Sequence, residues 1–210
     1  LAGDFLFAQA SWHLANLDDL EVVKLLSRVI MDLADGEVTQ GLFRFDTAQS
    51  RETYLEKSYC KAASWIANSA RAAGVLSDCS PSELDGLYRF GRQLGLAFQV
   101  VDDILDFTGS DQQLGKPAAS DLASGYLTAP TFYAMEEQPG LQALIAREFA
   151  EPGDLDQALE MVRSSRAIPR TRELAETFAR ESRDAIAWMS DSPCKRALLE
   201  LPDFVLSRLY

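Results

Sequence analysis

The sequence predicts an all-α protein, and two observations support that prediction. Apolar residues recur every three or four positions along most of the chain, which is the spacing of one helix face. No run of alternating apolar and polar residues is long enough to indicate a strand. With 210 residues, of which 47% are hydrophobic, the chain can bury a substantial core. We therefore expect residues 1–210 to form a single helical domain.

The composition excludes several classes of function. A net charge of −12 argues against nucleic-acid binding and against attachment to anionic lipid through basic residues. The three cysteines have no close spacing, so they indicate neither a metal site nor a disulfide framework. No apolar run approaches the roughly 20 residues of a membrane span. The sequence opens on Leu1 without a signal or transit segment, and we expect it to begin within a longer protein.

The first two helices are expected at residues 1–15 and 20–42, where apolar residues keep helical spacing. The single histidine, His13, has no neighbouring histidine or cysteine, so a surface or capping role is favoured over metal binding. Asp32 and Asp35 belong to a charged run. Because such runs usually stay in water, a solvated face is at least as plausible for them as a site.

The middle of the chain predicts two longer helices. Ser50 can cap a helix whose body is residues 54–73. After a connector, Pro81 is placed to open the next helix, since proline is favoured at the first helical position. Beyond these, four further helices of the scaffold are expected at residues 141–149, 155–166, 171–189 and 197–210.

The most informative stretch is residues 91–116, GRQLGLAFQVVDDILDFTGSDQQLGK. Its apolar residues cover more than half of a helix that should end near residues 108–109. At about 100° per residue, Gln99 and three aspartates share the remaining narrow polar sector, and Gly95 should leave open space there. The aspartates are Asp102, Asp103 and Asp106.

These aspartates are poorly placed for helix stability. Carboxylates in the last turn oppose the macrodipole, which costs about 0.3–1 kcal/mol each. Asp102 and Asp106 also repel one another at a spacing of four residues. The pattern therefore indicates either a solvated polar face or a cation site. Mg²⁺ is the leading ion, since it uses one or two carboxylates and keeps water and phosphates as other ligands. Lys116 follows closely and suggests a phosphate ligand.

At this point the residues resemble a known family. FQVVDDILDFTGSDQQLGKPAASDLASGYLTAP resembles the second aspartate-rich motif, DDxxD, of trans-prenyl (polyprenyl) diphosphate synthases, with that family's LGKP…DL…G.LT.P continuation. LAGDFLFAQASWHLANL, GEVTQG, YLEKSYCKAASWIA and FVLSRLY are similar to the long-chain, solanesyl-type synthases of plastids and cyanobacteria. The resemblance covers essentially the whole chain. It implies the isoprenoid synthase fold, a helical bundle around a central cavity.

The resemblance also implies a reaction. Family members use Mg²⁺ to condense isopentenyl diphosphate with an allylic prenyl diphosphate, and the solanesyl type makes a long all-trans polyprenyl diphosphate for quinone side chains. A homodimer or a heteromeric assembly is implied, as is a plastid location, with the cytoplasm as the other choice. By the same resemblance, the metal would be held by Asp102, Asp103 and Asp106, and diphosphate or the reacting end would be bound by Lys57, Ser58, Gln99 and Lys116.

Some features depart from the family pattern. The first aspartate-rich motif and its arginines should precede LAGDF, and they are missing from this sequence. Tyr126 stands where many relatives carry Asn or Lys, and Ala119 where many carry Gly. An alternative is therefore a non-catalytic subunit with the same fold and a regulatory or structural role in a larger complex. Phe98 is equally compatible with the core and with stabilising a cation.

Overall fold

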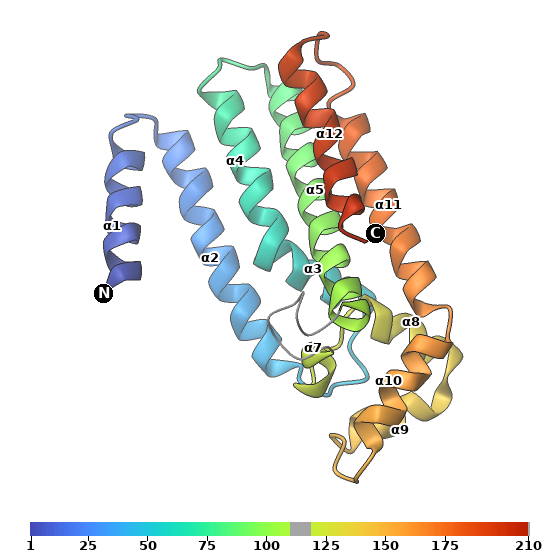
Figure 1. The fold of residues 1–210 in the computed structure, drawn as a ribbon. Helices are drawn as coiled ribbons and strands as arrows, with labels where there is room; N and C mark the ends of the chain where they lie inside the picture. Colours follow the sequence, from blue (N-terminus) through green and yellow to red (C-terminus); the bar gives the residue numbers. More distant parts are fainter. Residues whose placement is uncertain (110–118, 210) are drawn as a thin grey trace.

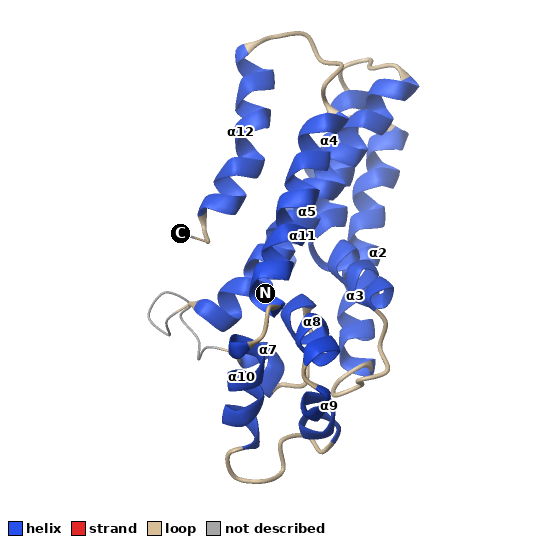
Figure 2. Cartoon of the chain, turned by 90° about the vertical axis from the view of Figure 1, so that its right-hand side faces the viewer, coloured by secondary structure: helices blue, strands red, loops and turns tan. Residues whose placement is uncertain are grey.

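The computed structural model describes residues 1–109 and 119–209, and this part of the chain is helical without any strand. Figure 1 shows α2, α4, α5, α11 and α12 running roughly side by side along the long axis, while the short helices α7 to α10 gather at one end. Figure 2 shows the same grouping from the side. The prediction of an all-α bundle is confirmed.

The elements follow one another as a series of antiparallel helices joined by short connections. Most boundaries lie within a few residues of those expected from the sequence. In chain order they are α1 (Ala2–Ala15), α2 (Leu20–Leu42), α3 (Arg51–Ser58), the π-helical turn η1 (Tyr59–Ala63), α4 (Ser64–Val75), α5 (Pro81–Thr108), α7 (Ser120–Ala123), α8 (Ala129–Glu137), α9 (Pro139–Ala146), α10 (Asp154–Ser164), α11 (Ala167–Ala185) and α12 (Pro193–Ser207).

Helix α5 is the centre of the bundle, and at 28 residues it is about 42 Å long. Its start is fixed by a capping box, in which the Ser80 backbone N–H donates to Glu83 Oε2 at 2.7 Å. Its end is at Gly109, whose backbone is extended. Helices α4 and α11 pack along it, and its Phe90, Leu96 and Val100 are buried in the core that they share. The end of α5 that carries the aspartates is therefore held rigidly.

The packing of α5 on α4 depends on two glycines. A Cβ atom on Gly91 would lie 2.5 Å from the Ile66 carbonyl oxygen, and one on Gly95 would lie 2.4 Å from the Cα atom of Ala63. Gly95 was expected to leave open space in the polar sector. That expectation is wrong, because the backbone of η1 fills the space and the glycine permits this close approach.

The single helix expected at residues 54–73 is divided in the structure. Helix α3 begins after Ser50, whose hydroxyl accepts from the Thr53 backbone N–H at 3.1 Å as predicted. The turn η1 then has π-helical hydrogen bonding before α4 continues. Such single π turns occur frequently at functional sites. Residue preferences of π and α helices are too similar for the sequence to have indicated it.

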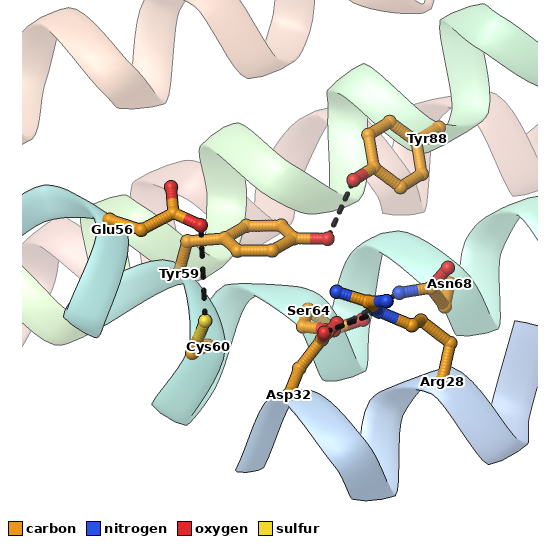
Figure 3. Close-up of polar contacts among 8 residues, drawn as sticks. All are labelled: Arg28, Asp32, Glu56, Tyr59, Cys60, Ser64, Asn68 and Tyr88. Carbon is orange, nitrogen blue, oxygen red and sulfur yellow. Dashed lines mark hydrogen bonds and ion pairs between the residues drawn. The ribbon is translucent and has the colours of Figure 1, made fainter. Parts of the chain in front are cut away.

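Asp32 is buried, so the solvated face considered for it is wrong. Its Oδ1 accepts from Arg28 Nε at 2.6 Å, and its other oxygen accepts from the Ser64 hydroxyl of α4. Figure 3 shows this cluster between α2 and α4, with Tyr59 and Tyr88 joined by their hydroxyls beside it. Because a buried carboxylate needs such partners, the cluster fixes α2 against α4. Asp35 is exposed, in agreement with the solvated face considered for it.

Helix α1 packs against α2 and buries none of its residues. His13 is exposed, with its ring edge against Trp12, which agrees with a surface role. Across residues 1–109 and 119–209, none of the helices combines the length and the apolar character needed to cross a membrane. Several large apolar side chains of α1 are left uncovered: Phe5, Leu6, Phe7 and Trp12.

Candidate active site

The polar end of α5 faces two adjoining cavities near the C-terminal end of α2. One cavity is lined mainly by carboxylates and the other by lysines, hydroxyls and amides. Lys61, Gln99, Asp103 and Asp121 line both of them, so the two form one continuous polar site. The side chains come from α2, from α3 with η1, from α5 and the segment after it, and from the end of α12, which meet at this site (Figure 1).

The carboxylate cavity has a volume of about 270 Å³. Its acidic residues are Asp102, Asp103, Asp106 and Asp121, and its basic residues are Lys61 and Arg208. Among residues 1–109 and 119–209, no three Asp, Glu, Cys or His side chains converge tightly enough to hold one ion. The three aspartates of α5 instead point to different neighbours, although they line the same space.

Asp106 is fixed by the segment that follows α5. Its Oδ1 accepts from the Ser120 hydroxyl at 3.1 Å and its Oδ2 from the Asp121 backbone N–H at 3.2 Å. Its own carbonyl accepts from the Ala119 N–H at 2.6 Å. Ala119 has a φ of +56°, a left-handed conformation that glycine adopts without strain. This explains physically why glycine would suit the position.

Asp103 points the other way, into the protein. Its Oδ2 accepts from the Tyr54 hydroxyl at 2.5 Å and its Oδ1 from Gln99 Nε2 at 2.9 Å. Burial raises the pKa of Asp103 to about 7, although the hydrogen bonds from Tyr54 and Gln99 act in the opposite direction. Burial, together with the carboxylate of Asp103, holds the pKa of Tyr54 well above its usual value. Asp103 is therefore a positioned and easily protonated carboxyl group.

Asp102 lies at the mouth of the carboxylate cavity and is about one-third exposed. Its Oδ1 lies 2.7 Å from Nη2 of Arg208, the residue that ends α12. The same guanidinium stacks on Phe98, with 4.7 Å between Arg208 Cζ and the ring centroid. Phe98 is 37% exposed, so it is not a core residue, and the ring face receives a cation in the form of Arg208.

The second cavity is small, about 30 Å³, and contains the predicted Lys57 and Ser58. Lys57 is buried, which lowers its pKa, while the nearby charge of Asp103 raises it in part. The Ser58 hydroxyl donates to the Tyr54 carbonyl at 2.9 Å. Lys61 joins the site from η1, with its Nζ 3.0 Å from Gln40 Oε1. Two ammonium groups beside four carboxylates suit a ligand that carries both metal ions and phosphate groups.

The donor chemistry of the carboxylate cavity fits Mg²⁺. This ion uses one or two carboxylates and fills its other positions with water and phosphate oxygens. The cavity offers hard oxygen donors from the partly exposed Asp102 and the buried Asp106, and it has room for waters and a diphosphate.

The structure brings most of the predicted site residues together. Asp102, Asp103, Asp106 and Gln99 line the carboxylate cavity, and Lys57 and Ser58 line the adjoining one. Lys116 lies outside the described residues. Several residues that line the site were not predicted from the sequence. They are Tyr54, Lys61 and Arg208.

These missed residues carried little signal. Lys61 gained nothing from the family pattern, and Tyr54 resembles any buried aromatic residue of a helix. Arg208 is separated from Asp102 by more than half of the chain and meets it only through the fold. Gln40 lines the site from the end of α2. The similarity of GEVTQG to the solanesyl-type synthases was the one indication of it.

A helical bundle with a carboxylate- and lysine-lined site at one end is the architecture of isoprenoid synthases, and comparison with known proteins supports this class. The polyprenyl synthetase family matches residues 1–162, and the chain belongs to that family. It is 60% identical over 210 residues to a prenyl transferase of Synechocystis sp., covering 100% of this chain and 65% of that protein. It is 47% identical over 209 residues to the chloroplastic solanesyl diphosphate synthase 2 of Arabidopsis thaliana, covering 100% of this chain and 50% of that protein.

Solved structures agree with the fold. Heptaprenyl diphosphate synthase from Staphylococcus aureus superposes with a TM-score of 0.93 at 29% identity, covering 99% of this chain and 66% of that one. The apo form of an Arabidopsis medium/long-chain prenyl pyrophosphate synthase gives 0.88 at 38% identity, covering 100% of this chain and 72% of that one. The chain thus spans about 65% of the length of the first curated relative that it matches, and half of the length of the Arabidopsis one.

Proposed function

We propose that the chain is the metal- and diphosphate-binding part of a long-chain prenyl diphosphate synthase of the solanesyl type. The protein would condense isopentenyl diphosphate with an allylic prenyl diphosphate and extend it to a long all-trans polyprenyl diphosphate. The observation that carries this proposal is the adjoining of two cavities, one lined by Asp102 and Asp106, the other by Lys57 and Lys61. A diphosphate that brings metal ions needs both kinds of lining.

We assign the metal to Asp102, Asp103 and Asp106, of which Asp102 is partly exposed and Asp103 and Asp106 are buried. When bound, Mg²⁺ supplies positive charge that offsets the negative charge developing on a departing diphosphate. The chain's own ammonium groups act in the same direction, since Lys57 is buried and its charge is little screened by water. Lys57, Ser58, Gln99 and Lys116 are the proposed contacts of the diphosphate and the reacting end.

Tyr54 and Gln99 have a positioning role in this proposal. Both hold the Asp103 carboxyl, so they fix the direction in which it faces the two cavities. The π turn η1 directs Lys61 into the site, where it meets Gln40. These contacts join groups of the chain itself. A preformed site of this kind needs little reorganisation when the charge of the leaving group develops.

A homodimer is the proposed assembly, with a heteromeric complex as the alternative. The exposed apolar residues of α1 support it, as does an apolar cavity of about 360 Å³ between α1, α2 and α4. Apolar areas of this kind are typical of surfaces that a partner covers.

A plastid location is proposed from the chloroplastic relatives of Arabidopsis. A non-catalytic subunit with the same fold remains the second candidate, favoured by Tyr126 in the site.

The test is an elongation assay on the full-length protein with Mg²⁺, an allylic diphosphate and labelled isopentenyl diphosphate. We expect long-chain products from the wild type and a loss of about 100-fold or more in Asp106→Asn, since the carboxylate that faces the metal is neutralised. Asp184→Asn, an exposed position on α11, is the matched control and should retain activity. Absence of product with every allylic primer would favour the non-catalytic subunit.

A further inference from the structure

The C-terminal helix α12 is attached only lightly to the bundle. It packs on α5 and α11, yet only Pro202 and Val205 of its residues are buried, and Phe204 is 68% exposed. Two ion pairs add to this attachment, one from Arg183 of α11 to Asp203 and one from Arg208 to Asp102. Since a lightly packed helix opens at little cost in free energy, the second pair can influence how its last turn is held.

Arg208 reaches the carboxylate cavity across the end of α5. Phe98 and Asp102 are four residues apart, so they lie on one face of α5. The guanidinium of Arg208 covers the Phe98 ring, with its Cζ 4.7 Å from the ring centroid. It also pairs with the Asp102 carboxylate, with Nη2 2.7 Å from Oδ1. The residue that ends α12 thus supplies a positive charge at the edge where the proposed metal would bind.

The guanidinium of Arg208 is only partly satisfied in its hydrogen bonding. Nη1 of Arg208 is buried and has no hydrogen-bond acceptor among the described residues. A buried donor without an acceptor is unfavourable, and the release of the guanidinium into water would satisfy it. The side chains of Arg208 and Asp102 are 32% and 37% exposed, so solvent weakens their attraction. The ion pair between Arg208 and Asp102 therefore helps to hold α12 against α5, but it can be broken at little cost in free energy.

We propose that Arg208 is a displaceable counter-ion of Asp102, so that metal binding at Asp102 releases the C-terminal end of α12 from α5. A divalent cation on this carboxylate would stand beside the guanidinium and repel it. By linkage, the docking of α12 must weaken metal binding by the same factor by which metal weakens docking. The inference rests on the proposed function, since it requires a metal at Asp102.

The first test is hydrogen–deuterium exchange of the full-length protein with and without Mg²⁺ at constant ionic strength. With Mg²⁺, we expect exchange in residues 203–207 to rise about two- to fivefold, which corresponds to the free energy typical of an exposed ion pair. Asp102→Asn should show the raised exchange without any metal, which tests the contact independently of metal binding. The matched control is Arg196→Gln, which removes an exposed ion pair between α12 and Asp191 of the turn before it and should behave as the wild type.

The second test is calorimetric titration with Mg²⁺ alone. Arg208→Gln should bind the ion about two- to fivefold more tightly than the wild type, while Arg196→Gln should bind it equally well. Unchanged or weaker binding by Arg208→Gln would overturn the proposal, and so would unchanged exchange in Asp102→Asn. If the wild type binds no Mg²⁺ at Asp102, the proposed metal site fails as well. Metal binding that is intact but insensitive to Arg208 overturns only the counter-ion.

Discussion

The buried Asp103 carboxyl should make the stability of this protein depend on pH in a defined direction. Its pKa is raised from the model-compound value of 3.8 to about 7 in the folded chain, with burial as the largest cause. Between these values the folded state binds the proton and the unfolded state does not. The free energy of unfolding therefore falls as pH rises from about 4 to 7, and this contribution is lost above pH 7.

The size of the effect follows from the shift. About 3 pKa units at 1.36 kcal/mol per unit correspond to about 4 kcal/mol of unfolding free energy. Asp103 is only 2% exposed, so solvent screening reduces this figure little. Asp103→Asn removes the titration and keeps an oxygen that can accept from the Tyr54 hydroxyl. The difference between wild type and variant isolates the contribution of this carboxyl group.

The assay is urea unfolding of both proteins between pH 4 and pH 8, in the presence of a chelator so that no metal affects the carboxylate. Relative to Asp103→Asn, the wild type should lose about 4 kcal/mol across this range. A difference between the two proteins that is independent of pH would show that Asp103 titrates normally. It would refute the burial argument on which its position in the site depends.

Three further changes test the remaining parts of the site and fold. Lys57→Gln should lower kcat/KM about 10- to 100-fold by removing a buried charge from the diphosphate cavity, whereas the exposed Lys24→Gln on α2 should change little. Gly95→Ala places a Cβ 2.4 Å from Ala63 Cα and should cost about 1–3 kcal/mol in urea unfolding; Gly41→Ala, which meets nothing within 4 Å, should cost none. Tyr54→Phe removes a hydrogen bond that lowers the pKa of Asp103, so carboxyl NMR of the metal-free protein should show that pKa about one unit higher or more.

Much of the fold could be predicted from the sequence, because helix periodicity and capping are local. The end of α5 near Thr108 and the cap at Ser50 were both predicted from residues within one turn of them. The π turn η1 could not be predicted, and neither could the close approach of its Ala63 to Gly95 of α5. The burial of Asp32 also depends on tertiary contacts, from Ser64 of another helix.

The site could be predicted in composition but not in arrangement. The polar sector of α5 gave Gln99 and the three aspartates, and they do line one cavity. Their different orientations depend on residues far along the chain. Tyr54 turns Asp103 inward, Ser120 fixes Asp106, and Arg208 pairs with Asp102. Helical spacing determines the helix face from which a side chain projects. The hydrogen-bond or ion-pair partner of that side chain is determined by how other elements pack against the helix.

In the proposed site, the aspartates at the end of α5 hold the metal that a bound diphosphate shares. The most direct measurement is anomalous diffraction from crystals of the full-length protein grown with Mn²⁺ in place of Mg²⁺ and with inorganic pyrophosphate. We predict an anomalous peak about 2.1 Å from carboxylate oxygens of Asp102 and Asp106, with pyrophosphate between it and Lys57. Bound pyrophosphate without metal at α5, or a peak confined to another part of the protein, would show that these aspartates do not hold the metal.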